Sequence, residues 1–160
     1  MIFVTIGSMF PFDRMVRAMD AWAAEQAEEI LAQIGAGSFE PRHMAWVRRL
    51  ERPDYAAAVA RSRMVVAHAG VGSVVSAGEQ GKPIVVLPRR AGLGEHTSDH
   101  QVQTIGWLRG KPGVQVADSE ADLPACIAAA AAAAAAGERI AATADPAFIA
   151  CIRRFIETGG

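Results

Sequence analysis

The sequence has few cysteines and no excess of charge of either sign. Its 160 residues include two cysteines, Cys126 and Cys151, and neither stands in the spacing of a zinc site or a redox pair. Buried thiols in a reducing compartment are the simplest interpretation. The 16 Lys and Arg against 17 Asp and Glu give a net charge of -1, which excludes an overall electrostatic attraction to nucleic acid or an anionic membrane. Any anionic ligand must therefore be bound locally.

Long hydrophobic runs are also missing. The longest run, Ala125 to Ala136, contains little but alanine and is shorter than the roughly 20 residues that a membrane-spanning helix needs. The N-terminus, MIFVTIG, shows no basic region ahead of a long apolar stretch, so we expect no secretory signal and a cytoplasmic location. A composition of 51% hydrophobic and 21% charged residues is typical of a globular protein, and the length predicts one domain, residues 1–160.

Short aliphatic runs alternate with stretches of helical period along the chain. This alternation predicts an α/β fold, in which helices join parallel strands. We expect strands within residues 2–6, 29–34, 44–50, 64–68, 83–87 and 114–116. We expect helices over residues 11–22, 54–61 with Asp54 as the cap, 71–80, 98–109, 122–136 and 146–157. The last helix has an apolar stripe that packs on the core or, alternatively, on a partner: Phe148, Ile149, Ile152, Phe155 and Ile156.

A glycine-rich segment follows the clearest buried strand. It reads His68-Ala69-Gly70-Val71-Gly72-Ser73 and leads into a helix. Ligands of open parallel sheets bind beyond the carboxyl ends of the strands, and a helix start attracts anions, so phosphate is the natural candidate. The segment is not a Walker A loop, and Val75 departs from the G-x-G-x-x-G fingerprint. A tight turn that needs glycine only for steric reasons is the alternative.

A second segment concentrates polar side chains between residues 95 and 101. His96 and His100 are four residues apart, which on a helix would place both rings on one face near Asp99, as in a metal site. The same residue types serve as hydrogen-bonding groups in a sugar and diphosphate site, and helix capping or surface solvation is a third interpretation. Four other basic residues are expected on the solvated surface rather than in a site: His43, Arg48, Arg49 and Arg52.

Five motifs carry a family resemblance when they are taken in order. They are Ile2–Ser8 with Pro11–Arg14, Gln33–Gly35, His68–Ser73, Gly81–Pro83 with Pro88–Arg89, and Gly94–His96 through Asp99–Gln101. Together they resemble the C-terminal domain of family 28 glycosyltransferases over residues 1–120. The stand-alone versions are most similar: the PssE-type subunits of bacterial exopolysaccharide synthesis and the soluble subunit of the two-chain dolichol-linked N-acetylglucosaminyltransferase. The C-terminal half of MurG-type enzymes is also similar.

The resemblance implies one half of a GT-B fold, a Rossmann-like parallel sheet with helices on both faces that binds a UDP-sugar. It implies an inverting hexosyltransferase of exopolysaccharide or lipid-linked saccharide synthesis, with no metal and no cofactor beyond the UDP-sugar donor. In split systems a separate membrane-anchored subunit binds the lipid-linked acceptor and usually supplies the catalytic base. Such a partner would bring this chain to the cytoplasmic face of the membrane, and the chain alone would be inactive.

The resemblance also implies two groups of donor-binding residues. The group expected at the diphosphate is Gly7, Ser8, Gly70, Gly72 and Ser73. The group expected at the sugar is Arg89, Glu95, His96, Asp99, His100 and Gln101, of which His100 and Glu95 are the candidates for a base within this chain.

One position departs from the family pattern. Many relatives have a ribose-binding Glu three residues after the Ser or Thr of the glycine loop, where this chain has Ser76. Glu79, three residues further along, is the expected substitute. Two other functions remain open at this point. One is a stand-alone regulatory module that binds nucleotide sugars, and the other is a metal-dependent hydrolase built on His68, His96, Asp99 and His100.

Overall fold

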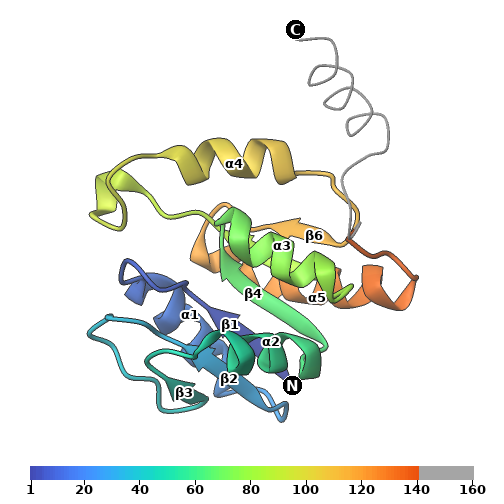
Figure 1. The fold of residues 1–160 in the computed structure, drawn as a ribbon, viewed down its shortest axis with the longest axis horizontal. Helices are drawn as coiled ribbons and strands as arrows, with labels where there is room; N and C mark the ends of the chain where they lie inside the picture. Colours follow the sequence, from blue (N-terminus) through green and yellow to red (C-terminus); the bar gives the residue numbers. More distant parts are fainter. Residues whose placement is uncertain (141–160) are drawn as a thin grey trace, which may run out of the picture.

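A computed structural model describes residues 1–140, and its central feature is a six-stranded sheet (Figure 1). The strands are β1 (Ile2–Thr5), β2 (Ile30–Gln33), β3 (Ala45–Val47), β4 (Met64–His68), β5 (Ile84–Leu87) and β6 (Val114–Val116). Their spatial order is β3-β2-β1-β4-β5-β6, and every neighbouring pair is parallel. The predicted α/β class and the six predicted strands are therefore confirmed.

Helices cover both faces of the sheet. They are α1 (Asp13–Ala23), α2 (Arg52–Arg61), α3 (Val71–Glu79), α4 (His100–Leu108) and α5 (Leu123–Ala135), with short 3-10 helices η1 (Ala91–Leu93) and η2 (Glu120–Asp122). Side chains that alternate along β1 enter two different cores. Ile2 and Val4 pack in the core that includes residues of α1 and α5, whereas Phe3 packs with residues of α2, α3 and α4.

The strands at the centre of the sheet are buried on both sides. All four residues of β1 and of β5 are buried, as are the first four of β4. Such strands have near-continuous apolar runs, because helices cover both faces of a parallel sheet. The edge strands β3 and β6 are shorter and partly exposed.

Three helices begin two residues away from the predicted position. Helix α1 begins at Asp13 and not at residue 11. Helix α2 begins at Arg52, so Asp54 lies in its first turn and is not the cap; Pro53, which suits a first turn, precedes it. Helix α4 begins at His100 and not near Ser98. Asp99 is the N-cap residue with non-helical backbone angles, and its carboxylate accepts a hydrogen bond from the Ala91 N–H, at 2.8 Å, instead of capping the helix.

Three other expectations concern the C-terminal part of the chain. Cys126 on α5 is half-buried, and burial raises the pKa of its thiol. Cys151 and the predicted helix over residues 146–157, with its apolar stripe, lie outside the described residues. Among the helices of residues 1–140, none combines the length and apolar character that are needed to cross a bilayer.

The strand order places a crevice at the carboxyl ends of β1 and β4. These strands are neighbours, but the chain leaves β1 for α1 on one face and leaves β4 for α3 on the other face. Ligands of open α/β sheets bind in the crevice at such a switch point. The loops that follow the two strands, with Gly7 and Gly70, therefore meet at one edge of the sheet.

Candidate functional site

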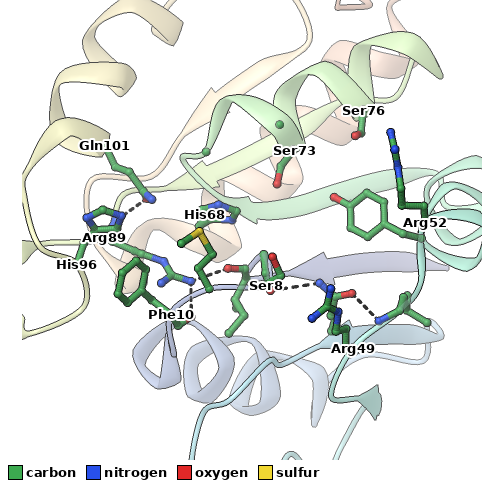
Figure 2. Close-up of a pocket in the computed structure, with 18 of the residues that line it drawn as sticks. Ser8, Phe10, Arg49, Arg52, His68, Ser73, Ser76, Arg89, His96 and Gln101 are labelled. Carbon is green, nitrogen blue, oxygen red and sulfur yellow. Dashed lines mark hydrogen bonds between the residues drawn. The ribbon is translucent and has the colours of Figure 1, made fainter.

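A cavity of about 500 Å³ lies at this carboxyl edge, a volume within the usual range of small-molecule sites (Figure 2). Its walls come from the β1–α1 loop, the segment between β3 and α2, the β4–α3 turn and the loop before α4. The tertiary structure thus brings together most of the residues that the sequence singled out. Those that line the cavity are Gly7, Ser8, Gly70, Gly72, Ser73, Arg89, His96, His100 and Gln101.

The start of helix α3 faces this cavity. Gly70 is the N-cap residue, and Gly72 and Ser73 belong to the first turn. The first N–H groups of a helix have no partner within the helix, and the partial positive charge there attracts anions. The first turn of α3 contains no acidic residue that would compete for this position. A phosphate group fits both the geometry and the charge of the helix start.

His68 at the end of β4 packs between the two glycine turns. A β-carbon at Gly7 would lie 2.8 Å from the imidazole Cε1, and one at Gly70 would overlap the Nε2 atom. Burial, with a further contribution from the charge of Arg89, lowers the pKa of His68 to about 4. The imidazole is therefore neutral near pH 7. Its buried Nδ1 has no hydrogen-bond partner within residues 1–140.

Arg89 is a buried cation in the wall of the cavity. Its side chain is 2% exposed, and it donates hydrogen bonds to the carbonyl groups of Ile6, at 2.5 Å, and Phe10, at 2.7 Å. Burial lowers the pKa of Arg89 to about 10, so the guanidinium remains charged at neutral pH. Its Nε has no hydrogen-bond partner within residues 1–140. An unneutralised buried charge beside a helix start strongly favours an anionic ligand.

The side chains near Arg89 supply hydrogen-bonding groups of mixed character. Gln101 is buried, and its Oε1 accepts a hydrogen bond from the Arg89 backbone N–H at 3.1 Å. The rings of His96 and His100 are 4.4 Å apart, centroid to centroid, in an edge-to-face arrangement. Desolvation, then the nearby charges of His100 and Arg89, lower the pKa of His96. Imidazole nitrogens and an amide offer both donors and acceptors of hydrogen bonds, as sugar hydroxyls do.

Glu95 and Asp99 lie outside the cavity lining and fix the loop that carries Arg89. Glu95 Oε1 accepts a hydrogen bond from Arg14 Nε at 2.7 Å, and Oε2 accepts one from the Arg90 backbone N–H at 2.9 Å. The carboxylate of Asp99 is bonded to the Ala91 N–H. Both carboxylates thus have partners within the loop and helix α1, and the geometry gives no support to Glu95 as a base.

The metal alternative lacks a ligand set in the described part of the chain. Within residues 1–140, no group of three or more His, Cys, Asp and Glu residues stands close enough to hold a metal ion. Glu79 is exposed at the end of α3 and does not line the cavity, whereas Ser76, one turn earlier, does. A ribose contact from Glu79 therefore remains a prediction that the cavity does not support.

Two arginines that the sequence assigned to the solvated surface turn out to line the cavity. Arg49 and Arg52 are exposed, as expected, but both line the cavity (Figure 2), as does Tyr55. Their position at or just after the end of the segment 44–50, in which a strand was predicted, was the available signal, because ligands bind at the carboxyl ends of strands. Arg48 and His43 do not line the cavity: Arg48 pairs with Glu40, and His43 lies against Asp20.

Among the described residues, the lining of the cavity carries positively charged side chains and no negatively charged ones. It includes three arginines, Arg49, Arg52 and Arg89, and no aspartate or glutamate among the residues of the described chain that form it. With the start of α3 at its centre, the cavity is complementary to a ligand that carries negative charge in the middle and planar or hydroxylated groups on either side.

The fold and the cavity define a Rossmann-like α/β domain with an anion-binding pocket at its switch point. The sequence model described as the glycosyltransferase family 28 C-terminal domain matches residues 1–107. The chain belongs to this family, as its motifs predicted. A comparison with curated protein sequences gives no match.

Solved structures with a similar fold include two glycosyltransferases of the GT-B type. One is CalG4, the calicheamicin glycosyltransferase, with a TM-score of 0.53 and 17% identity; the match covers 80% of this chain and 34% of CalG4. The other is the glycotransferase of kitacinnamycin, with a TM-score of 0.58 and 16% identity, over 81% of this chain and 34% of that protein. The chain therefore has the fold of one half of a GT-B protein and spans about a third of the length of each neighbour.

Proposed function

We propose that this chain is the donor-binding half of an inverting, UDP-sugar-dependent glycosyltransferase. The observation that carries the proposal is the cavity at the start of α3, which three arginines line and no carboxylate enters in the described chain. Such a lining stabilises a diphosphate in the bound donor. It stabilises further the negative charge that develops on the departing nucleoside diphosphate when the sugar is transferred.

Each part of the cavity has a place in this proposal. The diphosphate binds at Gly70, Gly72 and Ser73, with Gly7 and Ser8 on the opposite wall and the buried charge of Arg89 beside it. The sugar binds near His96, His100 and Gln101, whose polar side chains match its hydroxyls. No bound metal is needed, because the guanidinium and the helix start supply the positive charge that a metal would otherwise provide.

The catalytic base comes from a second subunit in this proposal. His100 is the remaining candidate within the chain, since Glu95 is engaged by Arg14. The partner is a membrane-anchored subunit that binds a lipid-linked saccharide, and it recruits this chain to the cytoplasmic face of the membrane. Exposed apolar side chains of Met9, Val71 and Val75 lie in or beside the segments that form the cavity and offer a surface for that subunit.

The binding step is tested by calorimetry with UDP on the full chain. We expect saturable binding that Arg89→Gln weakens strongly. The matched control is Arg61→Gln, which removes one positive charge at the far end of α2, outside the cavity lining. Absence of UDP binding, or equal weakening by both substitutions, would overturn the proposed donor site.

The transfer step is tested by co-expression with a candidate membrane subunit and a screen of UDP-sugars on lipid-linked acceptors. We expect transfer with inversion at the anomeric carbon only when both chains are present, as in exopolysaccharide or lipid-linked saccharide synthesis. Transfer by the single chain would contradict the half-enzyme proposal. Tight UDP-sugar binding with no transfer in any combination would favour a regulatory module instead.

A further inference from the structure

Gln33 ends strand β2 with a buried polar side chain that borders the cavity. It is 4% exposed, and it opens the Gln33–Gly35 motif of the sequence. Burial of an amide costs free energy unless hydrogen bonds within the protein replace its contacts with water. The hydrogen-bond partners of Gln33 therefore indicate why an amide stands at this position.

The Gln33 amide joins two walls of the cavity. Its Nε2 donates to the Gly7 carbonyl at 3.2 Å and to Thr5 Oγ1 at 3.4 Å, and its Oε1 accepts from the Leu50 N–H at 2.9 Å. Gly7 belongs to the β1–α1 loop, and Leu50 belongs to the segment between β3 and α2. A carbonyl group can only accept and an N–H group can only donate, so these partners require a donor at one end of the side chain and an acceptor at the other. Neither a carboxylate nor an apolar side chain supplies both.

The hydrogen bond from Gln33 sets the orientation of the Gly7–Ser8 peptide. Gly7 has a φ of 76°, a conformation that glycine adopts readily. In a trans peptide, the carbonyl and the following N–H point in opposite directions. Strands β2 and β4 lie on opposite sides of β1, so a Gly7 carbonyl that is bonded to Gln33 of β2 points away from β4 and the α3 start behind it. The Ser8 N–H, which has no hydrogen-bond partner within residues 1–140, is then directed toward the α3 side.

We propose that Gln33 is a positioning residue that holds the Gly7–Ser8 peptide with its N–H, and not its carbonyl, toward the diphosphate. This rests on the proposed function, in which the diphosphate binds between Gly7, Ser8 and the start of α3. An N–H group is attracted to a phosphate oxygen, whereas a carbonyl oxygen in the same place would repel it. Gln33 thus acts on the ligand through the main chain of Gly7 and Ser8. Its bond to Leu50 fixes this loop relative to the opposite wall of the cavity.

The test replaces the amide by side chains of similar length. Gln33→Met removes all three side-chain hydrogen bonds without adding charge. Gln33→Glu keeps an acceptor for the Leu50 N–H, but it has a donor for the Gly7 carbonyl only when the introduced carboxyl group is protonated.

Ser62→Ala is the control for the loss of a buried hydrogen bond. Ser62 is 1% exposed, its hydroxyl donates to the Val59 carbonyl at 2.8 Å, and it does not line the cavity. Calorimetry on the full chain gives the dissociation constant for UDP, and displacement of UDP gives that for inorganic diphosphate. Urea unfolding gives the folded fraction of each variant under the same conditions.

We expect Gln33→Met to raise both dissociation constants about tenfold, as is usual when a buried hydrogen-bonding group loses its partner. Gln33→Glu should raise them at least as much at about pH 8, and should approach the wild type at about pH 5.5, because burial favours the protonated carboxyl group. Gln33→Met should remain weakened at both pH values. Ser62→Ala should bind UDP as the wild type does.

The proposal is overturned if Gln33→Met binds UDP as the wild type does, or if the folded fraction accounts for its loss of affinity. A loss for UDP without a loss for inorganic diphosphate also overturns it, as does a Gln33→Glu variant that stays weakened at the lower pH. If Gln33→Met does not fold, the pH comparison with Gln33→Glu decides. All these outcomes leave the proposed function standing, because UDP binds the wild type. If the wild type does not bind UDP, the proposed function fails and this inference fails with it.

Discussion

The arginines that line the cavity differ in their surroundings. Arg89 is 2% exposed and its guanidinium is bonded to main-chain carbonyls, whereas Arg49 and Arg52 are exposed to solvent. A buried charge interacts with an anion in a low-dielectric environment and is already oriented, while an exposed charge is screened by water. The same residue type is therefore expected to act with different strength. The buried Arg89 should contribute more to the affinity for an anion than either exposed arginine.

The first predicted difference concerns the affinity for UDP. Arg89→Gln should raise the dissociation constant for UDP roughly 100-fold, about 2.7 kcal/mol, because a buried charge that faces an anion is lost. Arg52→Gln should raise it less than about tenfold, as is usual for exposed charges. Calorimetry on both variants, with thermal unfolding as a check of folding, measures the contrast. A similar rise of the dissociation constant in the two variants would show that the buried and the exposed arginines do not differ in their contribution to binding.

The next prediction uses the buried histidine beside Arg89. The pKa of His68 is lowered to about 4 in the folded state, against about 6.5 in the unfolded state. As the pH falls between these values, the unfolded state takes up a proton that the folded state does not, so the free energy of unfolding decreases, by up to about 3 kcal/mol. Urea unfolding of the wild type and of His68→Gln across this pH range isolates the effect. The variant should show a shallower slope, and equal slopes would exclude His68 as the source.

Two glycines of the same turn should respond differently to alanine. A β-carbon at Gly70 would overlap the buried His68 ring, whereas one at Gly72 would meet no atom within 4 Å. We expect Gly70→Ala to lower the free energy of unfolding by about 1–3 kcal/mol, as overpacking does. Gly72→Ala should leave it unchanged or raise it by up to about 1 kcal/mol, because alanine favours the helix. Chemical denaturation measures both, and a neutral Gly70→Ala would show that the imidazole moves freely.

The smallest effect is expected for the ion pairs that hold the loops. Arg14 and Glu95 have side chains 16% and 10% exposed, whereas Arg109 and Asp118 are 53% and 63% exposed. Arg14→Gln should lower the free energy of unfolding by about 1–2 kcal/mol, because the partly buried Glu95 loses its partner. Arg109→Gln should change it by less than about 0.5 kcal/mol. If denaturation experiments gave the same change in the free energy of unfolding for both variants, the burial of an ion pair would not determine its contribution to stability.

The six strands of the sheet could be predicted from the sequence because the pattern of a buried strand lies within the residues of that strand. Strands buried on both faces contain uninterrupted aliphatic runs, such as Met64–Ala67, and the short length and β-branched residues of these runs favour strands over helices. Helix starts were less well predicted. Just before α4, the Asp99 carboxylate accepts a hydrogen bond from the Ala91 N–H, and such a contact cannot be recognised from the periodicity of apolar residues.

The candidate site was predicted in part for the same reason. The glycine turn and the polar segment near residue 100 have distinctive residue types, and most of these residues line the cavity. Glu95 and Asp99 are polar residues of the same segment, but they do not line the cavity. The carboxylate of Glu95 accepts a hydrogen bond from Arg14, and that of Asp99 accepts one from the Ala91 N–H. Arg49 and Arg52 were assigned to the surface because exposed arginines are usual there, and only their place near the end of the strand predicted within residues 44–50 pointed to the cavity.

The sequence by itself determined the fold class, the order of the strands along the chain and the family, because burial patterns and motif spacing are properties of local segments. Only the tertiary structure decided which side chains share the cavity and which of its charges are buried. The β1–α1 loop, the start of α2 and the loop after β5 are separated along the chain and meet only at the carboxyl edge of the sheet. Desolvation depends on that assembly, so the difference between Arg89 and Arg52 has no counterpart in the sequence.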